Sequence, residues 1–233
     1  RPEGLMQTGN DCLVCFLRQA LATVRRCSDD PAVHWRIAAE VGAMLSDFDP
    51  RLPPPENAVH YYRHIARRTG VADPYLAEKR ESNAFALALE ARTRECIQQD
   101  RDPLLAAIQF AVSANVLDYG AQRLLDRDQA LASCRQPFAV NHYEALRGQV
   151  GHKVNILYLA DNCGEIVFDK LLIEQLLARG CQVTLAVRQS PIINDATLED
   201  ARLCGIDRLC PVIDNGADRS EERRVGKECR SRW

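Results

Sequence analysis

The sequence lacks any apolar run close to the roughly 20 residues that are needed to cross a bilayer, and its N-terminus lacks a signal-peptide pattern. It has no internal repeat, and it has no excess of one charge, since 30 Lys and Arg stand against 32 Asp and Glu. These absences argue against a membrane protein, a secreted protein and a nucleic-acid-binding surface. We therefore expect a cytoplasmic protein with neither a membrane nor a nucleic-acid partner. Nothing in the sequence specifies an oligomeric state.

The composition is that of a globular protein with many cysteines. The chain has 233 residues, 46% of them hydrophobic, which suits one large domain or two small ones. Its ten cysteines are scattered through apolar stretches, which argues against a small disulfide scaffold and for buried, reduced thiols. Cys12 and Cys15 share one face of a predicted helix, so buried core thiols and a metal or redox pair both stay open. The five histidines form no ligand pattern.

The last fifteen residues, 219–233, differ from the rest of the chain. "RSEERRVGKECRSRW" contains six Lys or Arg and three Glu without any apolar period. It resembles a read-through of a common sequencing adapter, fused in frame to an incomplete gene, although a basic tail for an acidic partner is the alternative. Without these residues the net charge changes from −2 to −5. We therefore treat 219–233 as non-native and expect a domain that is cut short at its C-terminal end.

Residues 1–150 predict a mainly helical region. Apolar residues recur at helical spacing, and the Asp-Pro and Ser-Asp-Asp-Pro sequences are typical helix starts. The predicted helices are Cys12–Val24, Pro31–Leu45, Glu56–Arg68, Tyr75–Gln99 and Pro103–Val116.

Residues 151–218 predict an α/β region with a Rossmann-like parallel sheet. Strands are predicted at Lys153–Ala160, at Cys181–Arg188 and from Asp207 to Ile213, with helices at Glu165–Ala178 and Thr197–Cys204. Because the strands are continuously rather than alternately apolar, we expect helices on both faces, in a three-layer α/β/α arrangement. Sheets of this kind bind ligands at the C-terminal ends of their strands.

Polar side chains follow two neighbouring strands at that edge. Asp161 and Asn162 end the first strand, and Asn194 and Asp195 come just past the second. Neighbouring strands lie about 5 Å apart, so these side chains can converge on one point. Carboxylate and amide oxygens suit Mg²⁺, Mn²⁺ or a related divalent ion. The alternative is that these residues only cap the helices that follow, and spacing does not separate the two interpretations.

Several segments together resemble one family, the damage-control phosphatases first described as the DUF89 family. The matching segments are "CLVCFLRQAL", "TGVADPY" with Lys79 and Asn83, "DPLLAAIQFAVSANVLDYG", "LADNCGEIVFDKLLIE", "VRQSPIINDATLEDA" and "VIDNG". They cover nearly all of residues 11–217 in the expected order, and the Cys-x-x-Cys pair is similar to that of the mainly prokaryotic branch.

The resemblance implies a divalent-metal-dependent phosphatase for small phosphorylated metabolites, such as sugar phosphates or damaged cofactor precursors. It implies Mn, Co, Ni or Mg as the cofactor, with Asp161, Asn162 and Asp195 as ligands. The family's Asn-x-x-Asp element falls on Asn115 and Asp118, beside the substrate pocket. Ala114 departs from the glycine expected before that element. The Lys-Gly-x-x-Asn element, expected after residue 218, is absent, so the activity is expected of an intact relative rather than of this fragment.

The remaining candidate residues follow from charge. Asp161 either orients the attacking water or acts as the nucleophile, and Arg188 is a candidate clamp for the phosphate or a surface charge at a strand end. Glu165 and Asn194 are expected near the substrate. Asp169, one helical turn after Glu165, is expected to be a structural partner.

Two other functions stay open at this stage. An S-adenosylmethionine-dependent methyltransferase would also have a Rossmann-like sheet, but its first turn is usually glycine-rich, whereas "DNCGE" has one glycine. A non-catalytic metabolite-binding module would bind its ligand without releasing phosphate.

Overall fold

The computed structural model describes residues 7–120, 131, 134 and 137–216, but not the side chains of residues 115–120. The tail at 219–233 lies outside this part of the chain. The chain divides into two compact units, which we describe one at a time. Among the described residues, unit 1 contains the chain up to Ala77 and Ser190–Ile193, and unit 2 contains Glu78–Gln189 and Asn194–Asn215.

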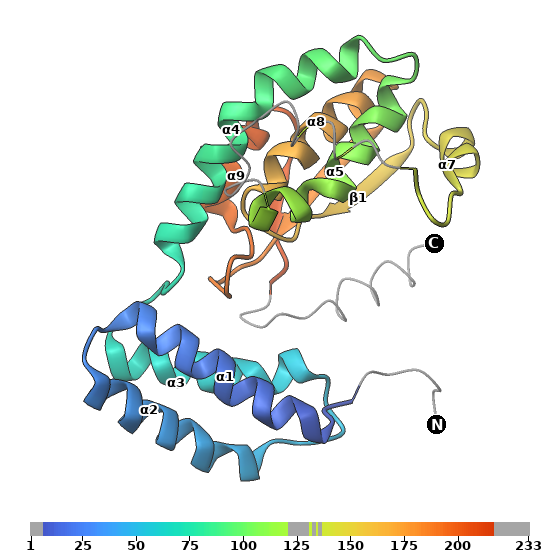
Figure 1. Ribbon diagram of the computed structural model, residues 1–233. Coiled ribbons are helices and arrows are strands. Elements are labelled where there is room, and N and C mark those ends of the chain that lie inside the picture. The colour runs from blue at the N-terminus through green and yellow to red at the C-terminus, as the bar shows by residue number, and fades with distance from the viewer. Residues whose placement is uncertain (1–6, 121–130, 132–133, 135–136, 217–233) are drawn as a thin grey trace. The chain divides into compact units, whose positions relative to one another are not determined.

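Unit 1 is a bundle of three helices (Figure 1). They are α1 (Asn10–Cys27), α2 (Pro31–Met44), which continues into the short 3₁₀ helix η1 (Leu45–Asp47), and α3 (Pro54–Thr69). Helix α1 packs against both others, and all three were predicted within three residues of their observed bounds. The bundle buries one apolar core, made of Phe16, Ala20, Val24, Ile37, Val41, Tyr61 and Ile65.

The ends of these helices follow from local chemistry. The Asp30 side chain accepts a hydrogen bond from the Ala32 N–H at 2.8 Å, and Pro31 occupies the first turn of α2. Gly70 ends α3 with a φ of 72°, a conformation that glycine adopts without strain.

The described residues of unit 2 form five α-helices and a sheet. Helix α4 (Leu76–Gln98) enters it from unit 1, and α5 (Pro103–Gly120), α7 (Tyr143–Gln149), α8 (Glu165–Ala178) and α9 (Leu198–Leu203) follow. Helix α7 was not predicted, because seven residues are too few to show a helical period. Helix α8 has the predicted bounds.

The sheet is parallel, as predicted, with the order β1-β2-β3. Its strands are β1 (Asn155–Leu159), β2 (Gln182–Val187) and β3 (Val212–Asp214), and Leu185 pairs with Tyr158 on one side and with Val212 on the other. Helix α8 contacts β2, and α5 lies beside α8 (Figure 1). Because α4 and α5 belong to this unit, the chain divides near residue 77, whereas the sequence predicted a boundary at residue 150.

The third strand is shorter than predicted. Residues Ile206–Arg208 form a 3₁₀ helix, η3, that follows Gly205 at a φ of 73°. Pro211 lacks an N–H for the ladder, and the strand begins only at Val212.

One face of the sheet is more open than the apolar runs predicted. Leu157, Leu159 and Ile213 are 38%, 52% and 47% exposed. Leu159 and Ile213 both align with Ala186 in the parallel register, so their side chains share a face. The second helical layer is therefore not found over these side chains among the described residues. No helix in that part of the chain combines the length and apolar character needed to span a membrane.

Candidate functional site

The segments that follow β1 and β2 pair with each other beyond the end of the sheet. Asn162 and Asp195 form an isolated antiparallel bridge. The Ala196 N–H donates to the Asp161 carbonyl at 2.7 Å, and the Cys163 N–H donates to the Asn194 carbonyl at 2.8 Å. These backbone bonds place Asp161 and Asn162 beside Asp195, at the C-terminal edge where the sequence predicted that they would meet.

The Asn162 side chain connects two carboxylates of this edge. Its Nδ2 donates to Asp161 Oδ2 at 3.2 Å and to Glu165 Oε2 at 3.4 Å. Glu165 begins α8, where the helix dipole favours an acidic side chain. Glu165 is therefore placed near Asp161 and Asn162.

Arg188 is the positively charged side chain that contacts both carboxylates of the site. Its Nε donates to Asp195 Oδ2 at 2.7 Å, and its Nη2 lies 3.7 Å from Asp161 Oδ1. The Arg188 side chain is 13% exposed, so it is not the solvated surface charge that was the alternative in the sequence. The guanidinium lies between the two carboxylates and limits their repulsion.

The two carboxylates differ in their environment. The Asp161 side chain is 55% exposed, whereas that of Asp195 is 13% exposed. Burial raises the pKa of Asp195 to about 6; the Arg188 guanidinium opposes this shift, and the negative charge of Asp161 adds to it. The site therefore holds two carboxylates close together, and ionisation of the largely buried one, Asp195, is costly because its charge is removed from water.

The donor chemistry of this edge suits a hard cation. Asp161, Asn162 and Asp195 offer oxygen ligands, and a bound cation would offset the negative charge of the two carboxylates, one of which is largely buried. Over the described part of the chain, His, Cys, Asp and Glu do not gather in threes that could hold a metal ion. A cation here would depend on two carboxylates, an amide and open positions for water or substrate.

Other candidate residues are placed differently. Asn194 contributes its carbonyl to the pairing of the two segments. Asn115 and Asp118 belong to α5, and their side chains lie outside the described part of the structure. Asp169 is buried and accepts a hydrogen bond from the Tyr158 hydroxyl at 2.5 Å, which agrees with the structural role that we expected.

The Cys-x-x-Cys pair does not fit the expectation of two buried thiols. Cys15 is exposed and Cys12 is partly buried, next to the core of unit 1. Both are free thiols on α1.

Three buried residues near the site received no role from the sequence. Lys79 and Asn83 on α4 are 2% and 0% exposed, and Asp200 on α9 is 5% exposed. Lys79 and Asn83 are one turn apart on α4, a helix of low amphipathicity. The sequence of such a helix does not indicate which of its polar residues are buried. A buried lysine cannot be recognised from periodicity alone.

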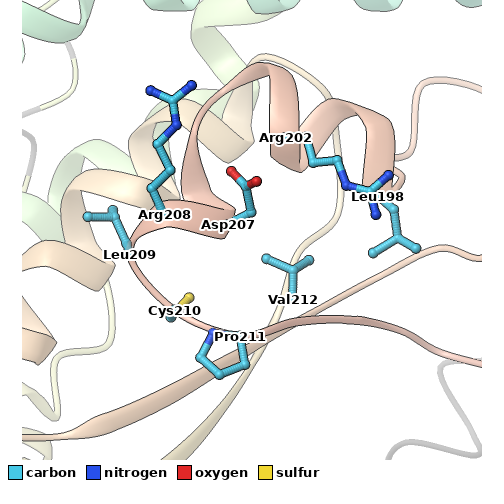
Figure 2. A pocket seen from close by; sticks show the side chains of 8 residues that line it. All are labelled: Leu198, Arg202, Asp207, Arg208, Leu209, Cys210, Pro211 and Val212. Atoms are coloured by element: carbon cyan, nitrogen blue, oxygen red, sulfur yellow. The ribbon is translucent and has the colours of Figure 1, made fainter.

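A hollow elsewhere in unit 2 contains none of the candidate residues. Its volume is about 570 Å³, and Figure 2 shows side chains of α9 on one side and Pro211 and Val212 on the other. It lies where the chain enters β3, and so at the N-terminal end of that strand, whereas ligands of parallel sheets bind at the C-terminal ends.

Comparisons with known proteins show the family and the fold of the chain. The model of the damage-control phosphatase ARMT1-like domain matches residues 8–227. A damage-control phosphatase of Archaeoglobus fulgidus is 29% identical over 212 residues, covering 88% of this chain and 73% of that protein. An uncharacterized protein of Methanocaldococcus jannaschii is 27% identical, covering 89% and 71%. The fold matches the crystal structure of a DUF89 family protein from Pyrococcus horikoshii with a TM-score of 0.82 at 23% identity, covering 97% of this chain and 82% of that one.

Proposed function

Because this chain belongs to the damage-control phosphatase ARMT1-like domain family, we propose that it is a divalent-metal-dependent phosphatase that acts on small phosphorylated metabolites. The observation that carries the proposal is the hydrogen-bonded pairing of the two strand ends, which brings Asp161, Asn162 and Asp195 together. Mn²⁺, Co²⁺, Ni²⁺ and Mg²⁺ are the candidate cations, and sugar phosphates or damaged cofactor precursors are the candidate substrates.

The oxygen ligands and Arg188 have different roles in this proposal. Asp161, Asn162 and Asp195 would hold the cation, which when bound neutralises negative charge on a phosphoryl oxygen. Arg188 already contacts both carboxylates, and its remaining N–H groups are suited to bind the phosphate oxygens in a bidentate manner.

Asp161 is the carboxylate best suited to act at the reacting group. Its side chain is 55% exposed, so a substrate and an attacking water can reach it, whereas Asp195 is largely enclosed. We assign to Asp161 the orientation of the attacking water, and to Glu165 and Asn194 positions that face the substrate. Asn115 and Asp118 are proposed as further substrate contacts on the basis of the family motif.

The test combines metal binding with turnover. Calorimetry of the chain with Mn²⁺ measures binding without substrate. Release of inorganic phosphate from a generic phosphate ester measures activity, and this assay uses an intact relative. We expect its turnover to depend on the metal and to fall by at least about 100-fold in the variant equivalent to Asp161→Ala, because the charge at the reacting centre is lost.

The matched control is Asp207→Ala. Asp207 is an exposed acid on η3 in the same unit and has no part in the site, so the Mn²⁺ affinity of the chain should not change. Turnover without metal, or turnover that Asp161→Ala leaves intact, would contradict the proposal. Binding of S-adenosylmethionine without metal would favour the methyltransferase instead.

A further inference from the structure

Helix α4 reaches both segments of the candidate site through side chains that are fully buried. Lys79 and Asn83 are one helical turn apart. Asn83 bonds to the starts of both α8 and α9, and Lys79 bonds to the start of α9. We call Lys79, Asn83 and Asp200 the α4 clamp.

Asn83 bonds to both segments at once. Its Oδ1 accepts from the Gly164 N–H at 2.8 Å, and its Nδ2 donates to Asp200 Oδ1 at 3.0 Å. Gly164 precedes α8 with a φ of 82°, a conformation that few other residues adopt. One side chain from a distant part of the sequence thereby fixes the turn after Asn162 and the helix after Asp195.

Asp200 carries the second half of the clamp. Its Oδ2 accepts from the N–H and the hydroxyl of Thr197 at 2.9 and 2.7 Å, and Lys79 Nζ lies 3.0 Å from the same oxygen. Burial opposes ionisation of this carboxyl, but the Thr197 hydrogen bonds and the Lys79 charge hold its pKa below the ordinary value. Asp200 is therefore a carboxylate that is fully satisfied inside the protein.

The clamp lies close to the oxygen ligands along the chain. Gly164 is two residues from Asn162, and Thr197 is two residues from Asp195. The charge of Lys79 also opposes the rise in the pKa of Asp195 that burial causes. Because Lys79 is 2% exposed and bonded to Asp200, it is not available to bind a substrate phosphate.

We propose that the α4 clamp is a positioning device, which sets the separation of the two segments and thereby the affinity of Asp161, Asn162 and Asp195 for their cation. The inference rests on the proposed function for the identity of the ligand, but not for the geometry. Residues that orient metal ligands from outside typically change metal affinity by 10- to 100-fold when they are removed.

Asn83→Ala is the direct test, and Lys79→Met is the second variant in case the first does not fold. Calorimetry measures the Kd for Mn²⁺, and hydrogen exchange measures protection of the Cys163 and Ala196 amides, which bond across the two segments. We expect the Kd to rise by at least about 10-fold. We also expect both amides to exchange faster than the change in global stability requires.

The matched control is Glu90→Ala. Glu90 is also on α4 and forms a largely buried ion pair, at 2.6 Å to Lys170 in the second turn of α8, beyond the segments where the clamp bonds to Gly164 and Asp200. Its loss should lower the thermal stability of unit 2 while leaving the Kd for Mn²⁺ and the relative protection of the two amides unchanged.

Three outcomes are distinguishable. If the clamp variants raise the Kd and expose the two amides while Glu90→Ala does neither, the inference holds. If the clamp variants behave as Glu90→Ala does, the inference is overturned even if the chain is a metal-dependent phosphatase. If the unaltered chain binds no Mn²⁺, the metal site of the proposed function fails, and amide protection alone decides whether the clamp sets the spacing.

Discussion

Buried polar side chains occur in both units, but in unit 1 they hold a loop, whereas in unit 2 they bond to the segments that carry the candidate ligands. In unit 1, Asn57 is 1% exposed and bonds to Asp49 N and O and to Thr8 Oγ1, which closes the loop before α3. In unit 2, the buried polar side chains Lys79, Asn83 and Asp200 lead to the two segments that carry the candidate ligands. The same chemistry therefore serves local structure in one unit and a proposed binding site in the other.

The largest effect should come from the site itself. Asp195→Asn removes a ligand charge, and we expect the Kd for Mn²⁺ to rise by more than about 100-fold. The pKa of Asp195 is raised to about 6, so at pH 7.5 its ionisation costs folding free energy, and the variant should be at least as stable as the original chain. Calorimetry and thermal unfolding at pH 7.5 measure the two effects. A variant that loses both stability and affinity would show that this carboxylate is structural.

The equivalent change in unit 1 should have the opposite profile. Asn57→Ala leaves Asp49 N and O and Thr8 Oγ1 without their partner, and each buried unpaired group costs about 1–3 kcal/mol. We expect the free energy of unfolding to fall by at least about 3 kcal/mol, measured by urea denaturation, with the Kd for Mn²⁺ unchanged. A change in that Kd comparable to the one in Asn83→Ala would remove the distinction between the units.

Much of this contrast could be predicted from the sequence. Apolar periodicity and caps such as Asp30 specify the helices of unit 1, and continuous apolar runs specify β1 and β2. The meeting of Asp161 with Asp195 also follows, because parallel strands end at one edge. Each of these features depends on residues that are close together in the sequence or on a general rule of sheets.

The α4 clamp and the short third strand could not be predicted in this way. Asn83 and Gly164 are 81 residues apart, and no local pattern indicates which distant backbone group a buried amide will bond. Strand β3 was predicted to begin at Asp207 but begins only at Val212, because Ile206–Arg208 forms a 3₁₀ helix after Gly205. Tertiary contacts and one left-handed glycine decided both features.

Asp169 is a buried acid of unit 2 that is not proposed to bind metal, so it can be compared with Asp195. Burial raises its pKa to about 8, the charges of Glu165 and Asp161 add to the shift, and the Tyr158 hydroxyl opposes it. Between the ordinary carboxyl pKa and about 8, the folded protein therefore binds a proton that the unfolded chain has lost. Stability is greatest below this range and should fall as the pH rises, by up to about 1.4 kcal/mol per pH unit.

Asp169→Asn should remove this slope while keeping an acceptor for Tyr158. The range from pH 6 to 8 isolates Asp169, because the Asp195 carboxyl contributes in the same direction only up to its own pKa of about 6. Urea denaturation at pH 6, 7 and 8 measures the slope in both proteins. An equal slope in the variant would show that another group titrates.

The smallest effects should separate two strained residues, one in each unit. Lys153 in unit 2 and Ile193 in unit 1 have φ angles of 66° and 46°, which cost a residue with a Cβ about 1–2 kcal/mol. Lys153 is exposed and precedes β1, at the opposite end of that strand from the ligands. Lys153→Gly should therefore raise the free energy of unfolding by about 0.5 kcal/mol, after the entropy cost of glycine, without changing metal affinity. Ile193 adjoins Asn194 and Asp195, so Ile193→Gly should loosen one ligand segment and raise the Kd for Mn²⁺ by about threefold, since about 0.5–1 kcal/mol of added backbone freedom must be lost on binding. Equal Kd values for the two variants would mean that the strain at Ile193 has no bearing on the site.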